Sequence, residues 1–230
     1  MHIGTIATAA AILSLSTPLV ATPLLATDIT VTFRENGPGG TLPARNASCV
    51  AAAGKAAAGS NKSPALSWTK GPAGTRSYAL AMTDPDVPAD LSLLNKEGTV
   101  IDKDAPRMEF THWILADIPA SATELAEGAD GDGMPAGGLA LEATRHGRRG
   151  QNGFAAFLKD GPHGGYMGAC PPWNDLRIHR YRVTVYALDT DRLTLPKVFT
   201  RADFLAAAKG HIVSSGAAEL TYTINAKATK

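Results

Sequence analysis

The feature that most limits the fold of this chain is a series of short strand-like segments bordered by proline or glycine. Five segments combine β-branched or aromatic residues with an apolar and polar alternation, at residues 29–33, 77–83, 110–118, 180–188 and 219–224. Such segments favour strands, because branched and aromatic side chains pack well on a pleated surface. The fold class is therefore predicted to be mainly β.

Helical patterns are weak until late in the chain. Thr200-Arg201-Ala202-Asp203 fits a capping box, and the alanine-rich residues 204–208 continue as a good helix former. This predicts one short C-terminal helix that packs on the sheet. Residues 51–62 are rich in alanine and glycine, which predicts a loop with at most a short helix. The long connections 88–109 and 120–168 are of the kind that is usually functional or mobile.

The composition is that of one ordinary globular domain. The chain has 230 residues, of which 44% are hydrophobic and 19% charged, and single β domains often run to about 200–250 residues. Lysine and arginine number 22 and acidic residues 21, for a net charge of +1. Because nucleic-acid binding leaves a basic footprint, we predict a single domain over 27–230 with no nucleic-acid partner.

Residues 1–26 have the composition of a secretory signal peptide. The first charged residue is Asp28, and the preceding stretch is apolar with small residues near its end, although only His2 stands where Lys or Arg is usual. Pro18 and Pro23 interrupt the apolar run, which disfavours a membrane-spanning helix. We expect a periplasmic or secreted protein with no membrane span once the leader is removed.

The mature part contains two cysteines, Cys49 and Cys170, separated by 121 residues. They are either a disulfide or two buried free thiols. An even cysteine count in an oxidising compartment favours pairing, so the expected export predicts a Cys49–Cys170 disulfide.

The segment Asp84-Pro85-Asp86-Val87-Pro88 follows the predicted strand 77–83. Two prolines within five residues are expected to stop the strand from pairing further. If the segment stays extended, its period of two places Asp84 and Asp86 on the same side, where both carboxylates could line one pocket. The alternative is a pair of solvated turn aspartates.

His112 lies inside the predicted strand 110–118, where alternation places it on one face with Phe110 and Ile114. A histidine on such an apolar face is more often a core residue than a ligand-binding one, unless an acidic partner lies opposite. Asp84 or Asp86, at the end of another strand, is a candidate for that partner.

A third candidate region begins at Gly168-Ala169-Cys170-Pro171-Pro172, which predicts a rigid extended turn. His179 and Tyr181 open the strand that follows and share a face. Tyr181 is either a core tyrosine with its hydroxyl at the rim or, together with His179, a hydrogen-bond donor to an oxyanion beside the proline-stiffened wall.

Motifs typical of several enzyme classes are missing from the sequence. It contains no Gly-x-Ser-x-Gly nucleophile elbow, no phosphate-binding loop and no His-Glu-x-x-His zinc motif. The glycine pattern at 131–136 contains Pro135 and follows no predicted strand, which excludes a dinucleotide site. We therefore predict no cofactor, no metal ion and no catalytic residues.

Several ordered stretches resemble the phosphatidylethanolamine-binding protein family, in particular its bacterial Raf-kinase-inhibitor-like branch. They cover roughly residues 33–222, and their order along the chain carries the resemblance. The stretches are Ser63-Pro64-Ala65-Leu66-Ser67-Trp68, Pro72-Ala73-Gly74-Thr75-Arg76-Ser77-Tyr78-Ala79-Leu80, Asp84-Pro85-Asp86-Val87-Pro88, His112-Trp113, Ile118-Pro119, Cys170-Pro171-Pro172-Trp173-Asn174-Asp175, His179-Arg180-Tyr181, Tyr186-Ala187-Leu188-Asp189 and Gly210-His211.

The resemblance implies two packed antiparallel sheets, a β-sandwich-like fold with short peripheral helices. It also implies a small cavity that accepts phosphate-like anions. Carried over by position, the cavity is lined by Asp84, His112, Pro171, His179 and Tyr181, with Asp86 supporting the loop and Cys170 in the wall.

The function expected from the sequence is that of an exported, non-catalytic binding protein for a small phosphate-like anion or a phospholipid headgroup, which could regulate a protein partner. One alternative is inhibition of a protease or kinase through protein–protein contact. The other is weak hydrolase activity that uses Asp84, His112 and His179.

An anion beside Asp84 requires a proton, because like charges repel in a partly dry pocket. His112, His179 or the ligand itself is expected to carry that proton. Binding should then strengthen from about pH 8 toward pH 6. On this interpretation, His179→Ala weakens binding without unfolding the domain.

Overall fold

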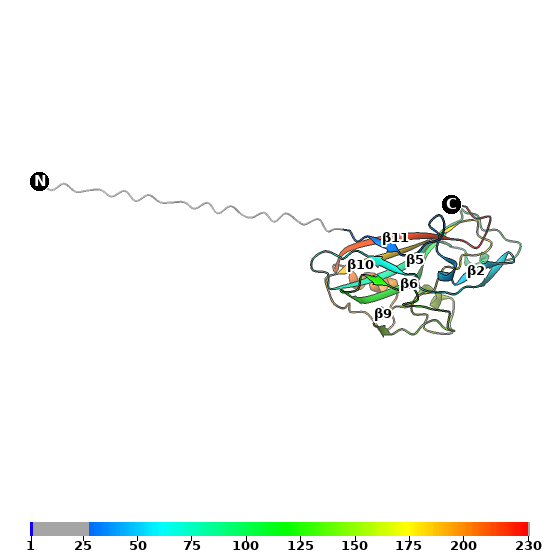
Figure 1. The fold of residues 1–230 in the computed structure, drawn as a ribbon. Helices are drawn as coiled ribbons and strands as arrows, with labels where there is room; N and C mark the ends of the chain where they lie inside the picture. Colours follow the sequence, from blue (N-terminus) through cyan, green and yellow to red (C-terminus); the bar gives the residue numbers. More distant parts are fainter. Residues whose placement is uncertain (2–27, 230) are drawn as a thin grey trace.

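The computed structural model describes residue 1 and residues 28–229, and the predicted leader, apart from Met1, lies outside them. As predicted, the fold is mainly β (Figure 1). The strands are β1 Val31–Phe33, β2 Cys49–Ala52, β3 Lys55–Ala58, β4 Leu66–Trp68, β5 Ser77–Pro88, β6 Arg107–Pro119, β7 Glu124–Leu125, β8 Ala143–Thr144, β9 Gly147–Arg149, β10 His179–Leu188 and β11 Ile212–Tyr222.

Three antiparallel sheets are formed by these strands. The largest has the order β11-β10-β5-β6-β9-β8, a second has the order β1-β4-β7, and β2 and β3 form a hairpin. The long strands β5, β6 and β10 lie side by side in the centre (Figure 1). Within residues 28–229, four short helices are peripheral: η1 Ala44–Asn46, η2 Leu91–Leu93 and η3 Gly153–Ala156, which are 3₁₀ helices, and the α-helix α1 Arg201–Ala208.

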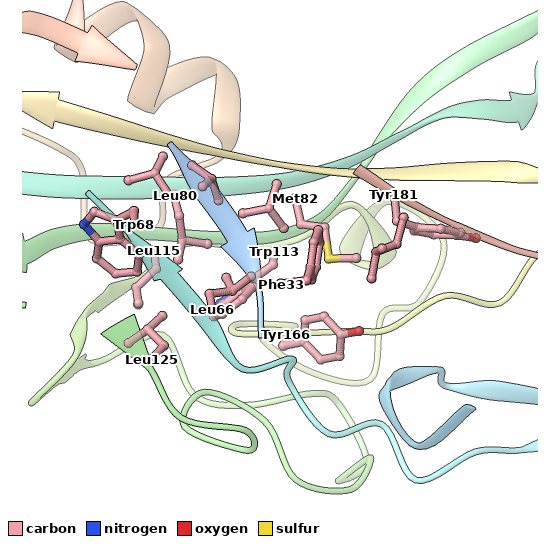
Figure 2. Packing of buried hydrophobic residues seen from close by; sticks show 14 of the residues in the cluster. Phe33, Leu66, Trp68, Leu80, Met82, Trp113, Leu115, Leu125, Tyr166 and Tyr181 are labelled. Carbon is pink, nitrogen blue, oxygen red and sulfur yellow. The ribbon is translucent and has the colours of Figure 1, made fainter. Parts of the chain in front are cut away.

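The large sheet is buried on both faces. On one face, residues of β5, β6 and β10 pack against Phe33 of β1 and Leu66 of β4 (Figure 2). On the other face, Ala81 and Ile114 pack with Phe199 and with Phe204 of α1. The first contact is the predicted face-to-face packing of two sheets, and the second is the predicted packing of the C-terminal helix.

The capping box predicted for α1 is present. The Thr200 hydroxyl accepts a hydrogen bond from the Asp203 backbone, and the Asp203 carboxylate accepts one from the Thr200 backbone amide. These reciprocal bonds satisfy amides that the first helical turn leaves unpaired. They fix the start of the helix at the edge of its apolar contact with the sheet.

The loop predicted at 51–62 is wrong, because β2 and β3 form a hairpin there. The strands turn at Ala53 and Gly54, whose φ angles of 45° and 76° are both positive. Positive φ at both central residues defines the tight turn that matches strand twist. Five alanines in the two strands hid the hairpin, since alanine has little preference for strands.

The proline-rich end of β5 does not stop pairing, contrary to the prediction. Val87 pairs with Met108 and Pro88 with Arg107 of β6, beyond the pair of Asp84 with Phe110. Between these pairs, two residues of β5 lie opposite one residue of β6. This β-bulge accommodates Pro85, which cannot donate to the ladder.

A second bulge changes the predicted face of His112. Met82 pairs with Trp113 and Thr83 with Thr111, so His112 is an extra residue in β6. Its ring contacts Phe110 and Tyr181, whereas Ile114 packs in the cluster on the opposite face of the sheet. The expected grouping with Phe110 is therefore correct, but the grouping with Ile114 is wrong.

Cys49 and Cys170 form the predicted disulfide, with Cα atoms 4.7 Å apart. The bond ties the start of β2 to the segment that precedes β10. No helix within residues 28–229 is long and apolar enough to cross a membrane.

Candidate ligand-binding cavity

A cavity of about 400 Å³ lies where β5, β6 and β10 end. One of its lining residues, Tyr181, lies at one end of the buried cluster shown in Figure 2. Six of the seven residues predicted to bind ligand line it: Asp84, His112, Cys170, Pro171, His179 and Tyr181. The structure thus brings together residues from three strands and one loop. Their role in ligand binding stays a prediction.

Asp86 is the predicted ligand-binding residue that does not line the cavity. Its buried carboxylate accepts hydrogen bonds from the side chain and backbone amide of Arg180 and from the side chain of Arg177. Burial alone would raise the pKa of Asp86, but these arginines hold it below its usual value. The bulge after Asp84 breaks the alternation that placed both carboxylates in one pocket. Asp86 instead anchors the loop to β10, the supporting role that the resemblance implied.

The polar residues Asp84, His112 and Tyr181 form the floor of the cavity. This floor is supported by a series of buried hydrogen bonds between charged groups. His179 Nδ1 lies 2.7 Å from Asp84 Oδ2, and His179 Nε2 lies 3.1 Å from Asp175 Oδ2. Arg107 donates to both Asp175 oxygens, at 2.5 and 3.1 Å. Burial would raise the pKa of Asp175, but the His179 and Arg107 bonds keep it lowered. Charges therefore alternate in sign from Arg107 to Asp84.

His179 carries the positive charge in the middle of this series. Burial disfavours an imidazolium, but the hydrogen bonds and charges of Asp175 and Asp84 outweigh it and raise the pKa of His179 to about 9. Both ring N–H groups are already donated to carboxylates at neutral pH. His179 therefore has no proton left for a ligand, which corrects the expectation that it donates to an oxyanion.

His112 has the opposite protonation state. Burial lowers its pKa, and the positive His179 adds to this effect, although Asp84 opposes it. Nδ1 lies 2.8 Å from the Met167 carbonyl oxygen, which fixes it as the N–H of the neutral ring. Nε2 is consequently an acceptor; it lies 4.0 Å from Asp84 Oδ2 and has no hydrogen-bond partner among the described residues.

Tyr181 supplies the remaining polar group of the floor. Its side chain is fully buried, and within residues 28–229 its hydroxyl makes no hydrogen bond of normal geometry. Burial and the neighbouring Asp84 carboxylate raise the pKa of Tyr181 well above its usual value, so the hydroxyl stays protonated. A buried hydroxyl without a partner costs about 1–3 kcal/mol.

The wall beside this floor is held by the disulfide and by backbone bonds. Cys170, Pro171 and Pro172 line the cavity. The preceding carbonyl, of Ala169, accepts hydrogen bonds from the amides of Ser48 and Cys49 at 2.9 and 3.2 Å. The hairpin that begins at Cys49 thus anchors the wall through both covalent and hydrogen bonds.

Sequence reasoning missed two groups of residues at the site. The first is Asp175 with Arg107, whose only sequence signal is the spacing of Asp175 four residues before His179. The second is a set of apolar residues from the two long connections: Leu91, Leu94, Phe154, Phe157 and Leu158. Both connections therefore contribute to the cavity.

The stability of the protein should fall as the pH rises from 6.5 to 9. A folded-state pKa above the unfolded value of His179 means that the folded state binds the extra proton in this interval. The contribution is fully present below pH 6.5, lost by about pH 9 and on the order of 3 kcal/mol. Urea unfolding at half-unit pH steps measures the slope. A flat profile between pH 6.5 and 9 would contradict the charged bridge.

No group of three or more His, Cys, Asp or Glu side chains within residues 28–229 is arranged to hold a metal ion. The chemistry available at the floor is hydrogen bonding. The Tyr181 hydroxyl can donate, while His112 Nε2 and the Asp84 carboxylate can accept.

Comparison with known proteins places the chain among relatives of the same fold. The UPF0098 protein YbcL of Escherichia coli (strain K12) is 31% identical over 138 residues, which cover 59% of this chain and 57% of YbcL. A UPF0098 protein of Methanothermobacter thermautotrophicus is 32% identical over 156 residues, covering 67% of this chain and 78% of that protein.

Two solved structures share the fold over most of the chain. The crystal structure of E. coli YbcL, described as a member of the mammalian PEBP family, matches with a TM-score of 0.61 and 24% identity, covering 86% of this chain and all of YbcL. A putative phosphatidylethanolamine-binding protein homolog from Chlamydia trachomatis matches with a TM-score of 0.57 and 25% identity, covering 85% of this chain and 97% of that chain.

The sequence profile named "Phosphatidylethanolamine-binding protein" matches residues 34–93 and 98–223, well over half of the chain. These residues include all the strands of the large sheet and every polar residue of the cavity floor. The chain belongs to the phosphatidylethanolamine-binding protein family.

Proposed function

We propose that this protein binds a small phosphate-like acid at the floor formed by Asp84, His112 and Tyr181, without transforming it. The observation that carries the proposal is that His112 Nε2 and the Tyr181 hydroxyl are buried beside the Asp84 carboxylate and make no hydrogen bond of normal geometry within residues 28–229. A buried polar atom without a hydrogen bond is costly, so a ligand that supplies bonds to both is favoured.

The ligand must bring or acquire a proton. Asp84 and His112 Nε2 are both acceptors. The two N–H groups of His179 are already donated, one to Asp84 and one to Asp175. A fully ionised phosphate would meet like charge and lone pairs. A phosphate monoanion resolves this conflict, because its hydroxyl donates to an acceptor on the floor while another oxygen accepts from Tyr181.

Phosphorylethanolamine should bind at least tenfold more tightly at pH 6 than at pH 8. The second pKa of a phosphate monoester is about 6, so the monoanion is abundant only at the lower pH. Titration calorimetry in two buffers of different ionisation enthalpy measures both the affinity and the proton uptake, which should be about half a proton at pH 6 and about one proton at pH 8. Equal or weaker affinity at pH 6 contradicts the proposal.

The matched control for this titration is glycerophosphorylethanolamine, a diester that has no proton to bring near neutral pH. If the ligand supplies the proton, the diester binds weakly at both pH values. If His112 takes up the proton instead, the diester also binds more tightly at pH 6, and His112→Gln removes that increase.

Tyr181→Phe should separate binding from folding. We expect affinity for phosphorylethanolamine to fall about tenfold or more, since a hydrogen bond to a charged group contributes about 1.5–3 kcal/mol. The free energy of unfolding should change by about 1 kcal/mol or less, because the hydroxyl, which faces the Asp84 carboxylate, makes no hydrogen bond of normal geometry within residues 28–229. A large loss of stability would show that the hydroxyl serves the fold.

We also propose that the protein is exported. The apolar leader 1–26 and the Cys49–Cys170 disulfide support this location, since disulfides persist in oxidising compartments. Fractionation of the producing cells, with mass measurement of the mature N-terminus, tests it. Full-length protein retained with reduced thiols would contradict export.

A further inference from the structure

We propose that the ligand carries one compact apolar substituent, which lies between two apolar walls above the polar floor. This inference rests on the proposed function, because the floor fixes where the acid group lies. It concerns the part of the ligand that does not contact the floor. A single substituent favours a monoester of an oxyacid over a two-chain lipid as the ligand.

The size of the cavity is the first support. A volume of about 400 Å³ has room for roughly a dozen water-sized groups at about 30 Å³ each, and a phosphate group, with its five non-hydrogen atoms, takes at most about five of these volumes. More than half of the cavity therefore remains above the head group. That remainder matches about seven or eight carbon atoms.

The lining of this remainder is the second support. One wall comes from the first long connection, with Leu91 and Leu94, and Val87 of β5 continues it. A second wall comes from the second connection, with Phe154, Phe157 and Leu158. Among the described residues, Asn95 is the one polar side chain that lines the cavity apart from those that form or support its floor. An apolar substituent gains free energy from the walls, whereas a charged one would lose hydration that a single amide cannot replace.

Exposure at the mouth is the third support. Leu91, Phe157 and Leu158 expose 37%, 47% and 45% of their surface. Burial of exposed apolar area is what a bound substituent would provide. The three residues line the same cavity as the polar floor. The site for the acid group and the site for the substituent are therefore adjacent.

Both walls are held in place by buried asparagines. The Asn174 side chain donates to the carbonyls of Leu93 and Thr99 and accepts from the Asn95 amide. The Asn152 side chain accepts from the Phe154 amide and donates to the Gly165 carbonyl. These bonds preorganise the apolar walls without using any floor residue, which lowers the entropy cost of binding.

Close packing behind the second wall shows the same fixed arrangement. The Phe110 ring meets Phe154 edge to face and stacks on Phe157, with centroids 5.0 and 5.8 Å apart. A Cβ atom at Gly153 would lie 2.5 Å from the Phe110 ring. Glycine at this position therefore allows η3 to sit directly on the sheet.

The test is a calorimetric series of methyl, butyl and hexyl phosphate at pH 6. Affinity should rise about two- to fourfold per methylene, the range expected for partial to full burial. Phe157→Ala combined with Leu158→Ala should remove most of the rise in affinity from methyl to hexyl phosphate. The matched control is Val198→Ala, which truncates a similarly exposed side chain (49%) outside the cavity.

The outcomes separate the two proposals. Equal affinity for all three phosphates in the unmodified protein overturns the apolar subsite and leaves the acid-binding floor intact. No binding of any of them, at either pH 6 or pH 8, overturns the proposed function and this inference with it. The unmodified protein decides both points without the variants.

A titration with a short-chain phospholipid tests whether the ligand is a lipid or a single-substituent monoester. Monomeric dihexanoylphosphatidylethanolamine has two chains and a diester head without an ionisable proton near neutral pH. We expect it to bind at least tenfold more weakly than hexyl phosphate. Binding as tight as that of hexyl phosphate would overturn the single-substituent monoester and assign the cavity to a lipid.

Discussion

Replacing His179 with alanine is expected to lower the free energy of unfolding by about 3–5 kcal/mol, the usual cost of removing one partner from a buried ionic network. Asp84 and Asp175 are each 1% exposed or less and share this imidazolium. Without it, two carboxylates face each other in a buried site. The melting temperature of a domain of about 200 residues should fall by roughly 6–20 °C.

The control for this variant is His211→Ala. His211 also bonds to an aspartate, Asp189, but both side chains are nearly half exposed, and exposed pairs contribute about 0–1 kcal/mol. The difference between His179→Ala and the unmodified protein should shrink above pH 9, where the imidazole loses its extra proton. A loss below 1 kcal/mol at pH 6.5 would show that the bridge does not stabilise the fold.

This result would also revise the expectation from sequence alone, in which His179→Ala weakened binding without unfolding the domain. That expectation treated the imidazole as a hydrogen-bond donor to an oxyanion. The structure places it in the interior, with both nitrogens occupied. A binding assay on His179→Ala would therefore report folding as much as recognition, and Tyr181→Phe is the better variant for measuring recognition.

Reduction of the Cys49–Cys170 disulfide is expected to cost about 4–5 kcal/mol. The bond closes a loop of 121 residues, and the chain-entropy relation gives nearly 5 kcal/mol for a loop of about this length. Urea unfolding with and without a phosphine reductant measures the change. Cys49→Ser combined with Cys170→Ser should match the reduced protein and show no further response to reductant.

An unchanged urea midpoint on reduction would contradict this prediction. It would show that the bonds from the Ser48 and Cys49 amides to the Ala169 carbonyl hold the segment without the covalent link. Ligand affinity of the reduced protein, measured where it remains folded, would show whether the wall at Cys170 and Pro171 depends on the disulfide.

The parts of the fold that follow local patterns were predictable from sequence. Alternation and β-branching located the central strands, and Thr200 with Asp203 located the start of α1. The β2–β3 hairpin was missed, because its strands consist largely of alanine and its turn depends on backbone angles at Ala53 and Gly54. Residue type alone does not report those angles.

The candidate site was predictable as a set of residues but not as an arrangement. Each of the two errors arises at a bulge, one that turns His112 away from the face of Ile114 and one that removes Asp86 from the cavity. Bulges depend on the pairing of two strands, so the sequence of one strand does not reveal them. The protonation of His179 likewise depends on Asp175, which lies outside the strand pattern.

The division between a floor built on strands and walls built on loops has a consequence for how such proteins diversify. The floor residues sit on the central strands of the large sheet, where a change would disturb the fold. The backbone of the walls is held by hydrogen bonds to Asn152 and Asn174, and several wall side chains are partly exposed. Substitution of these side chains should therefore cost little stability. If the floor binds an acid group as proposed, a change of wall side chains alone would change which substituent the site accepts.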